Sequence, residues 1–370
     1  MYRIRLLLSF SAILVLLSCE KNSSENALGF ISDSLDSLFA TASDFSGVIL
    51  VADHGKPVYH KAFGYRAFDE QVAQDTNSIF ELASVSKQFT AMAIMMLQHE
   101  GRVNFDDPIE KYIPIPYPGI TIRHLLHHTS GLPDYQAVMD QHWDKNLVAG
   151  NDDNIAYLIK YRPASSFSPG EKFEYSNTGY MLLATIAERA SGKDFIALCN
   201  EKIFRPLKME KTSIRTKVEK LKIPEIAWGH IHVQEKGRYI RADSFPEFNY
   251  TIWLGDRKGP GRVSATASDI LKWDRALYGK ELVPAELIAE AFTPATLNDG
   301  SVSQYGFGWY IQEHATHGKI VYHNGDNPGY ATTIVRYLEQ DLTVILLSKN
   351  AHAKFDSIAA GVRLIVENVL

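Results

Sequence analysis

The chain has 370 residues and a formal net charge of -5; 45% of its residues are hydrophobic and 22% are charged. This composition is ordinary for a globular protein, and the length suits one large domain or two of medium size. The charge balance is slightly acidic, and no run of basic residues interleaved with aromatic residues is present. We therefore expect no nucleic-acid partner.

The N-terminal residues carry the pattern of an export signal followed by a tether. Arg3 and Arg5 precede an apolar stretch over 6–17, which is too short to span a bilayer but suits a signal peptide. It ends in Leu16-Leu17-Ser18-Cys19, which resembles the lipobox of bacterial lipoproteins. We expect a signal peptide at 1–18 and a lipidated Cys19 at the head of a flexible tether over 19–29. The protein would then be exported and lipid-anchored to a bacterial membrane; the alternative is an ordinary signal peptide with an incidental cysteine.

The cysteine count bounds the disulfide chemistry of the chain. Only 2 cysteines are present, so a lipidated Cys19 leaves Cys199 without a partner for a disulfide. Cys199 ends an apolar helical run over 195–199, which favours a buried, inert thiol.

The expected secondary structure has strands towards both ends of the chain and helices between them. Strands are predicted at 47–51 and 58–63, with a turn over 54–57, and again at 305–312, 320–323, 332–337 and 343–348. Helices are predicted at 31–42, through most of 84–207, at 267–278 with Ser268 or Asp269 as a cap, and at 354–369. The simplest α+β packing for a domain over 30–370 joins both sets of strands in one antiparallel sheet flanked by helices. A mainly helical second lobe covers roughly 84–260, and a cleft between the lobes holds the site.

The tetrapeptide Ser84-Val85-Ser86-Lys87 stands at the head of an apolar helical run. On a helix Lys87 lies one turn after Ser84 on the same face, within reach of its hydroxyl. A desolvated ammonium loses its proton more easily and can then act as a base, so this pair is a candidate nucleophile and activator. Taken alone, a serine and lysine at this spacing usually lie on a solvated helix face.

Two later elements supply possible partners. Tyr175-Ser176-Asn177 lies on a turn just before a predicted helix, and His323-Asn324-Gly325 lies near the end of a predicted strand. Individually, a core tyrosine, a helix N-cap asparagine and a strand histidine with a satisfied ring are the simpler interpretations. The order of the three elements along the chain favours a catalytic set.

These elements resemble the S-x-x-K, Y-x-N and K-T-G or H-x-G elements of serine β-lactamases and penicillin-binding proteins. With a tyrosine in the second element, the chain resembles the branch that contains class C β-lactamases, D-alanyl-D-alanine carboxypeptidases and esterases. Three further segments also resemble that family, namely residues 122–133, 261–266 and 305–309. The resemblance covers nearly all of the chain after the tether. It implies the β-lactamase/transpeptidase-like fold.

The resemblance also implies roles for individual residues. Ser84 would be acylated, Lys87 would help to remove its proton, and Tyr175 would be held as a phenolate or share a proton with Lys87, acting as base and then as acid. Asn177 would bind the substrate amide or order Lys87. His323 and Asn324 would face the substrate, and the backbone N–H groups of Ser84 and Asp326, the residue after Gly325, would form the oxyanion hole.

The chain departs from the family pattern at the third element. Many β-lactamases have lysine where this chain has His323, which is largely neutral at pH 7 and offers a hydrogen bond rather than a fixed charge. Asn324 stands where threonine is common, and Asp326 adds a negative charge. These departures argue against assuming β-lactams as substrates. No equivalent of the class A glutamate that activates the deacylating water is identifiable.

The function predicted is therefore a serine hydrolase that forms an acyl-enzyme on an amide, an ester or a D-amino-acid peptide. The alternative is a penicillin-binding sensor that is acylated but turns over poorly. Neither requires a cofactor, and we expect a monomer that acts on a small-molecule or peptide substrate.

One cluster imitates a metal site. His124, His127 and His128 have the i, i+3, i+4 spacing of ligands on one helix face, but no carboxylate or cysteine accompanies them. We therefore predict no metal. Asp106 and Asp107 precede Pro108 and are read as a loop or helix start rather than an acid–base pair.

Overall fold

A computed structural model describes residues 29–42, 44–350 and 354–370. The expected signal peptide, Cys19 and the tether up to residue 28 lie outside these residues. The described chain divides into two units, one made of the residues up to Asp44 together with Asp356–Leu370, the other of Phe45–Phe355. Every site residue expected from the sequence, apart from Cys19, belongs to the second unit.

The smaller unit contains the two terminal helices. Residues 29–41 form the first helix and α12 (Phe355–Glu367) forms the last, close to the ranges that the sequence predicts. They pack against each other at Gly361, where an added Cβ would lie 3.3 Å from both Cδ atoms of Leu38. The lack of a side chain at Gly361 thus permits this close approach.

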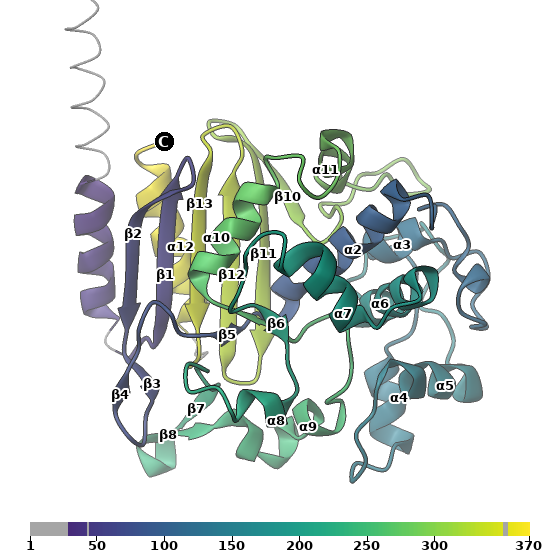
Figure 1. Cartoon of the computed structure of the whole chain (residues 1–370), viewed down its shortest axis with the longest axis horizontal. Coiled ribbons are helices and arrows are strands. Elements are labelled where there is room, and N and C mark those ends of the chain that lie inside the picture. The colour runs from purple at the N-terminus through teal and green to yellow at the C-terminus, as the bar shows by residue number, and fades with distance from the viewer. Residues whose placement is uncertain (1–28, 43, 351–353) are drawn as a thin grey trace, which may run out of the picture. The chain divides into compact units, whose positions relative to one another are not determined.

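The larger unit is built on an antiparallel sheet with the strand order β10-β11-β12-β13-β1-β2. The strands come from both ends of the unit, which confirms the predicted arrangement: β1 (Gly47–Asp53), β2 (Lys56–Phe63), β10 (Tyr310–His314), β11 (Gly318–Asn327), β12 (Tyr330–Tyr337) and β13 (Leu342–Ser348). In Figure 1 the purple β1 and the yellow β13 lie side by side.

The central strands β12 and β13 are covered on both faces. Every residue of β12 and β13 is buried, and Val48 in β1 pairs with Leu347 in β13. At the β1–β2 turn His54 and Gly55 have φ angles of 48° and 73°. Two successive positive φ angles are typical of the type I′ turn that matches the twist of a hairpin.

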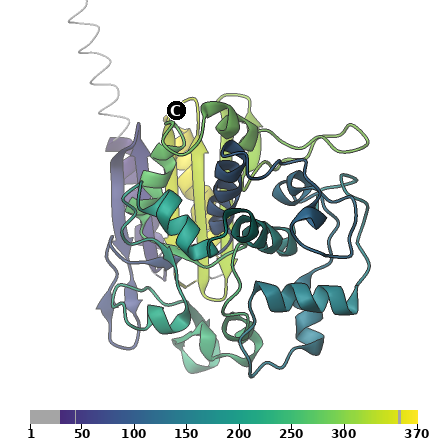
Figure 2. The same cartoon turned by 45° about the vertical axis from the view of Figure 1, so that its right-hand side comes forward.

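Within the larger unit, α10 packs against β13 and β1, and further helices fill the region beyond β11 (Figures 1 and 2). The longer ones are α2 (Lys87–His99), α4 (Tyr135–His142), α5 (Asn151–Tyr161), α6 (Asn177–Ser191), α10 (Ala267–Ala276) and α11 (Ala285–Ala291). The shorter ones are α3 (Ile122–Leu126), α7 (Phe195–Cys199), α8 (Lys217–Lys220), α9 (Tyr250–Trp253), the 3-10 helices η1 (Ala83–Ser86), η2 (Ile109–Lys111), η4 (Gln234–Lys236), η5 (Ala242–Ser244) and η6 (Pro246–Phe248), and the π-helical turn η3 (Asn200–Phe204).

Three small sheets lie outside the main one. The first contains β5 (Phe80–Glu81), β9 (Val263–Ala265) and β6 (Ser213–Ile214) in the order β5-β9-β6. The other two are hairpins of β3 (Tyr65–Ala67) with β4 (Val72–Ala73) and of β7 (His230–Val233) with β8 (Arg238–Arg241). The β5-β9-β6 sheet matters for the site, because β5 leads directly into η1 and α2.

Two local predictions were wrong. The strand expected at 305–312 begins only at Tyr310, because Gly308 has a φ of 81° and turns the chain. The N-cap of α10 is Thr266, whose side chain accepts a hydrogen bond from the Asp269 N–H, rather than Ser268 or Asp269. The turn before β10 directs Tyr305 into the interior, where it is completely buried.

Candidate active site

Ser84 is presented by a tight turn between β5 and α2. The Leu82 N–H donates to the Val263 carbonyl at 2.8 Å, and Ala83 then adopts a φ of 49°. A left-handed conformation is unfavourable for alanine and persists where the surrounding structure enforces it, commonly at functional sites. Ser84 stays partly exposed while Ala83 and Val85 are buried, so the turn offers one hydroxyl to the outside.

Lys87 is the first residue of α2 and is completely buried. Its Nζ lies 3.0 Å from Ser84 Oγ, 2.9 Å from Asn177 Oδ1 and 2.8 Å from the Pro260 carbonyl oxygen. Desolvation, and then the nearby positive charge of Arg257, lower the pKa of Lys87 well below its ordinary value. In the neutral form its nitrogen has a lone pair that accepts the proton of Ser84, so the geometry suits a base.

Tyr175 lies over this pair. Lys87 Nζ is 4.7 Å from the centre of its ring, and its hydroxyl oxygen is buried without a hydrogen bond to the described residues. Burial raises the pKa of Tyr175, and its interaction with the Ser84 hydroxyl offsets only part of that effect. The raised pKa favours the protonated phenol in the resting site and so, of the two states expected from the sequence, the one in which Tyr175 shares a proton with Lys87.

Asn177 is the first residue of α6, and the residue that caps this helix holds it in position. The N-cap is Ser176, whose side chain accepts a hydrogen bond from the Gly179 N–H at 3.3 Å. Asn177 is therefore not the cap, and its amide oxygen is available to Lys87. The element Tyr175-Ser176-Asn177 thus brings two side chains to Lys87 and uses the third to begin the helix.

His323, expected to face the substrate, is buried beside Tyr175, with 6.1 Å between the ring centres. It is 1% exposed, its Nδ1 lies 2.6 Å from the Asn324 carbonyl oxygen, and its Nε2 lies 2.9 Å from the Tyr305 hydroxyl. An Nδ1–H that donates to the carbonyl leaves Nε2 as the acceptor of the Tyr305 proton. Desolvation, followed by the charge of Lys87, lowers the pKa of His323 to about 3.

The remainder of the third element lies along β11. Asn324 is exposed, and its Oδ1 accepts a hydrogen bond from the Thr333 hydroxyl at 2.7 Å. Because successive side chains of a strand alternate between faces, Asn324 points to the face opposite His323 and Gly325. Asp326, next along the strand, is exposed.

Gly325 is where β11 touches the nucleophile turn. A Cβ added to it would lie 2.2 Å from the Leu82 carbonyl oxygen and 3.1 Å from the Ser84 nitrogen. Only glycine allows this approach. The backbone after Gly325 therefore passes beside the backbone of Ser84.

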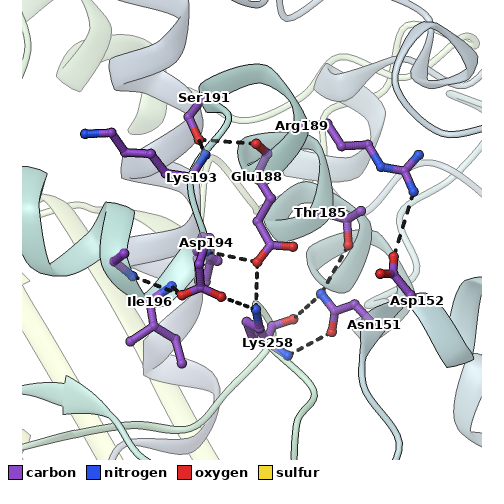
Figure 3. Close-up of polar contacts among 12 residues, drawn as sticks. Asn151, Asp152, Thr185, Glu188, Arg189, Ser191, Lys193, Asp194, Ile196 and Lys258 are labelled. Carbon is purple, nitrogen blue, oxygen red and sulfur yellow. Dashed lines mark hydrogen bonds and ion pairs between the residues drawn. The ribbon is translucent and has the colours of Figure 1, made fainter.

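The segment 257–261 completes the surroundings of Lys87, and a polar network holds it (Figure 3). Lys258 Nζ lies 2.7 Å from Glu188 and 2.6 Å from Asp194, and Asn151 bonds both backbone groups of Lys258. The next carbonyl, that of Gly259, accepts a hydrogen bond from the Thr90 hydroxyl at 2.7 Å. These contacts fix the carbonyl of Pro260 against Lys87.

Comparison with known proteins identifies the family. The β-lactamase family profile matches residues 35–367. The chain belongs to the β-lactamase family. Membership makes this chain a serine hydrolase, with the β-lactamase/transpeptidase-like fold that its sheet and helices display.

Two curated relatives of this β-lactamase-family chain are bacterial. Penicillin-binding protein 4* of Bacillus subtilis is 39% identical over 319 residues, which cover 85% of this chain and 71% of that protein. Protein flp of Staphylococcus aureus is 28% identical over 311 residues, which cover 81% of this chain but only 58% of that protein. Among solved structures, the octameric penicillin-binding protein homologue from Pyrococcus abyssi has a TM-score of 0.76 and 28% identity, over 90% of this chain and 76% of that one.

The three histidines that imitated a metal site have separate tasks in this family member. His124 completes a capping box with Thr121 at the start of α3, and His127 Nδ1 lies 2.9 Å from the Tyr305 carbonyl oxygen. His128 accepts the Ser176 N–H at 3.0 Å and lies 4.3 Å from Tyr175, ring centre to ring centre. The described residues contain no group of three or more metal-ligating side chains.

Several site features had little or no signal in the sequence. From the sequence, residues 122–133, 261–266 and 305–309 are recognised only as segments that resemble the family, without roles for individual residues. The structure shows that Tyr305 pairs with His323, that His128 packs on Tyr175, and that Pro260 accepts a hydrogen bond from Lys87. A backbone carbonyl that depends on the path of a loop leaves no pattern of residue types.

Two remaining sequence expectations concern the rest of the chain. Cys199 is buried, and burial raises the pKa of its thiol, in line with an inert cysteine. No helix among the described residues is long and apolar enough to cross a membrane. The lipid anchor expected at Cys19 falls on residues that the structure does not describe.

Proposed function

We propose that Ser84 is the nucleophile of an acyl-enzyme mechanism that cleaves an amide, an ester or a D-amino-acid peptide. The observation that carries the proposal is the completely buried Lys87 with its Nζ 3.0 Å from Ser84 Oγ. A buried ammonium is disfavoured, so neutral Lys87 takes the hydroxyl proton as Ser84 attacks the carbonyl carbon. Asn177 and the Pro260 carbonyl hold the amine in position during this step.

The remaining steps follow from the same groups. The carbonyl oxygen becomes an oxyanion, for which the backbone N–H groups of Ser84 and Asp326 are the proposed donors. The Tyr175 hydroxyl forms no hydrogen bond to the described residues, so we assign it the transfer of its proton to the leaving group, after which it regains one from Lys87. Water then attacks the ester on Ser84 and gives a proton to Lys87, and Lys87 passes a proton to the departing Ser84 oxygen as the acid is released.

Replacement of the nucleophile tests this proposal. We expect Ser84→Ala to lower the turnover of a nitrophenyl ester by at least about 10³-fold, because no other group can form the acyl-enzyme. Ser86→Ala is the matched control, since its hydroxyl accepts the Val263 N–H at 3.1 Å. Turnover of Ser84→Ala within ten-fold of the parent chain would contradict the proposal.

A penicillin-binding sensor is the second candidate. It is supported by the relative named penicillin-binding protein 4*, which is 39% identical. Intact-mass measurements after a short exposure to a penicillin separate the two functions. An adduct on Ser84 that lasts for hours supports the sensor, while rapid return of the free mass supports the hydrolase.

We propose further that the protein is exported and held at a bacterial membrane by lipid on Cys19. The lipobox-like end of the predicted signal peptide supports this localisation. Cys19→Ser is expected to move the protein from the membrane fraction to the soluble fraction, and Cys199→Ala, which alters the buried cysteine, is expected to leave it on the membrane. Cys19→Ser protein that stays with the membranes would refute the anchor.

A further inference from the structure

A small hollow of about 70 Å³ lies near the nucleophile turn. Glu81 and Asn327 are part of its lining, and they stand three residues before Ser84 and one residue after Asp326. The hollow therefore adjoins β5, which leads into the turn that carries Ser84, and the end of β11, which carries Asp326. Its other ionisable lining groups come from 217–262: Lys217, Lys220, Asp243, Arg257 and Arg262.

Two of the positive charges in this hollow are already paired. Lys217 Nζ lies 2.8 Å from Asp243, and Lys220 forms an ion pair with Glu81. That pairing, together with the charge of Arg262, lowers the pKa of Glu81 to about 2 against the opposing effect of burial, so its carboxylate is ionised. The charges of these four residues cancel within the wall.

Arg262 and Arg257 lie near the Glu81 carboxylate, which already pairs with Lys220, and neither guanidinium forms an ion pair of its own within the part of the chain that the structure describes. Arg262 is 7% exposed, has a φ of 79°, and makes one long hydrogen bond of 3.4 Å to the Leu254 carbonyl. A left-handed backbone and a buried charge each cost free energy, so this arginine is retained against two penalties.

Arg257 points from the same segment that holds Lys87. Its Nη1 donates to the Tyr135 hydroxyl at 2.5 Å, and its Nε is buried with no hydrogen-bond partner. Gly261 separates this side chain from the nucleophile turn: an added Cβ would lie 3.7 Å from the Ala83 carbonyl oxygen and 3.9 Å from Arg257 Nη2. Because Gly261 has no side chain, it leaves space between Arg257 and the nucleophile turn.

The position of Tyr175 indicates which part of a substrate this hollow meets. A leaving group must lie beside the phenol that protonates it, and Tyr175 is not among the residues that line the hollow. Because Glu81 and Asn327 lie near the proposed oxyanion donors in the sequence, we assign the hollow to the acyl portion, which stays on Ser84 after the first step. A guanidinium matches a carboxylate through two parallel hydrogen bonds, and it keeps its charge when buried.

We propose that the hollow is a subsite for a carboxylate on the acyl portion of the substrate, held by Arg257 and Arg262. This rests on the proposed acyl-enzyme mechanism and adds a substrate class to it. The enzyme then prefers acyl groups that carry an acidic side chain or terminus.

Two esters with acyl chains of equal length test the subsite: 4-nitrophenyl hexanoate and the 4-nitrophenyl monoester of adipic acid. The quantity measured is the ratio of kcat/KM for the adipate ester to that for the hexanoate ester. We expect the ratio to exceed one in the parent chain and to fall at least about ten-fold in Arg257→Gln and in Arg262→Gly, because each loses a charge-assisted contact. Arg262→Gly also suits the positive φ, so it keeps the test valid if Arg257→Gln fails to fold.

The matched control is Lys217→Gln, which removes a cation from the same hollow that is already paired with Asp243. We expect its ratio to stay within two-fold of the parent ratio. Ratios that are unchanged in both arginine variants, or that fall equally in Lys217→Gln, overturn the subsite. If the proposed function is wrong instead, Ser84→Ala still hydrolyses both esters, so the two failures are distinct.

Discussion

The buried ionisable groups near Ser84 fall into two regions, one in which burial favours the neutral form and one in which the groups stay charged. On the side of Lys87 the neighbours are the rings of Tyr175, Tyr180 and Tyr305 with His128 and His323, which we name the aromatic wall. Burial there favours the neutral form of every titratable group: the pKa values of Lys87, His128 and His323 are lowered and those of the three tyrosines are raised. In the hollow, the guanidinium groups of Arg257 and Arg262 cannot lose their protons and remain charged.

The difference separates chemistry from recognition. Burial lowers the pKa of Lys87 and so frees its amine to take up a proton, which a mechanism of proton transfer requires. Groups that stay charged cannot take part in such transfer but attract an opposite charge at any ordinary pH. Arg257 connects the two regions, because its charge also helps to lower the pKa of Lys87.

The largest effect that would test this comparison is expected at Lys87. Lys87→Met fills the buried space without an amine, and we expect kcat/KM to fall by about 10³ to 10⁴-fold for both esters, since the base is lost. The ratio of the adipate to the hexanoate ester should stay within two-fold of the parent ratio, because the hollow is unchanged. A large change in that ratio would contradict the separation of the two regions.

A smaller effect is expected at the contact between β11 and the nucleophile turn. Gly325→Ala places a methyl group 2.2 Å from the Leu82 carbonyl oxygen, so the strand and Ser84 must move apart. We expect a loss of about 1 to 3 kcal/mol in the free energy of unfolding, measured by urea titration, and a fall in activity towards both esters.

Gly179→Ala is the control for that variant. Gly179 lies in α6, and an added Cβ would make ordinary contacts of 3.4 Å or more with Leu125. We expect this variant to be as stable as the parent chain or slightly more stable, because alanine favours a helix interior over glycine. Equal stability of Gly325→Ala and the parent chain would show that the strand does not press on Ser84.

The sequence predicted much of the fold, because its signals are local. Apolar runs at Gly47–Val51 and Thr343–Ser348 indicate central strands, and the helical spacing of apolar residues locates the terminal helices. The spacing of Ser84 and Lys87 likewise follows from one helical turn. The structure adds that the pair meets Asn177 and Pro260, which no local pattern contains.

The burial of His323 could be predicted from the alternation of residues along its strand, but the family resemblance suggested a contact with the substrate instead. His323 has the same parity along β11 as Val321 and Gly325, and all three are buried, whereas Asn324 and Asp326 are exposed. Alternation alone therefore predicts an inward ring. Arg262 had no such signal, because a positive φ at a residue other than glycine depends on the path of the loop.

The pH dependence of the ester ratio gives the smallest expected effect and the sharpest contrast between His323 and the arginines. If a histidine with an ordinary pKa bound the substrate carboxylate, the ratio would fall as the pH rose through about 6.5. His323 has a pKa of about 3 and is neutral throughout, while the arginines stay charged. We therefore expect the ratio to be constant between about pH 6 and 9, where the substrate carboxylate is ionised.

The activity itself should depend on pH over the same range. Since Lys87 must be neutral to act as a base, kcat/KM for both esters should rise in parallel as the pH increases through its lowered pKa. Parallel profiles measured with the two esters would assign the titration to the aromatic wall and leave recognition to the hollow. A ratio that falls with rising pH would instead place a titrating cation at the substrate carboxylate and remove the arginines from that role.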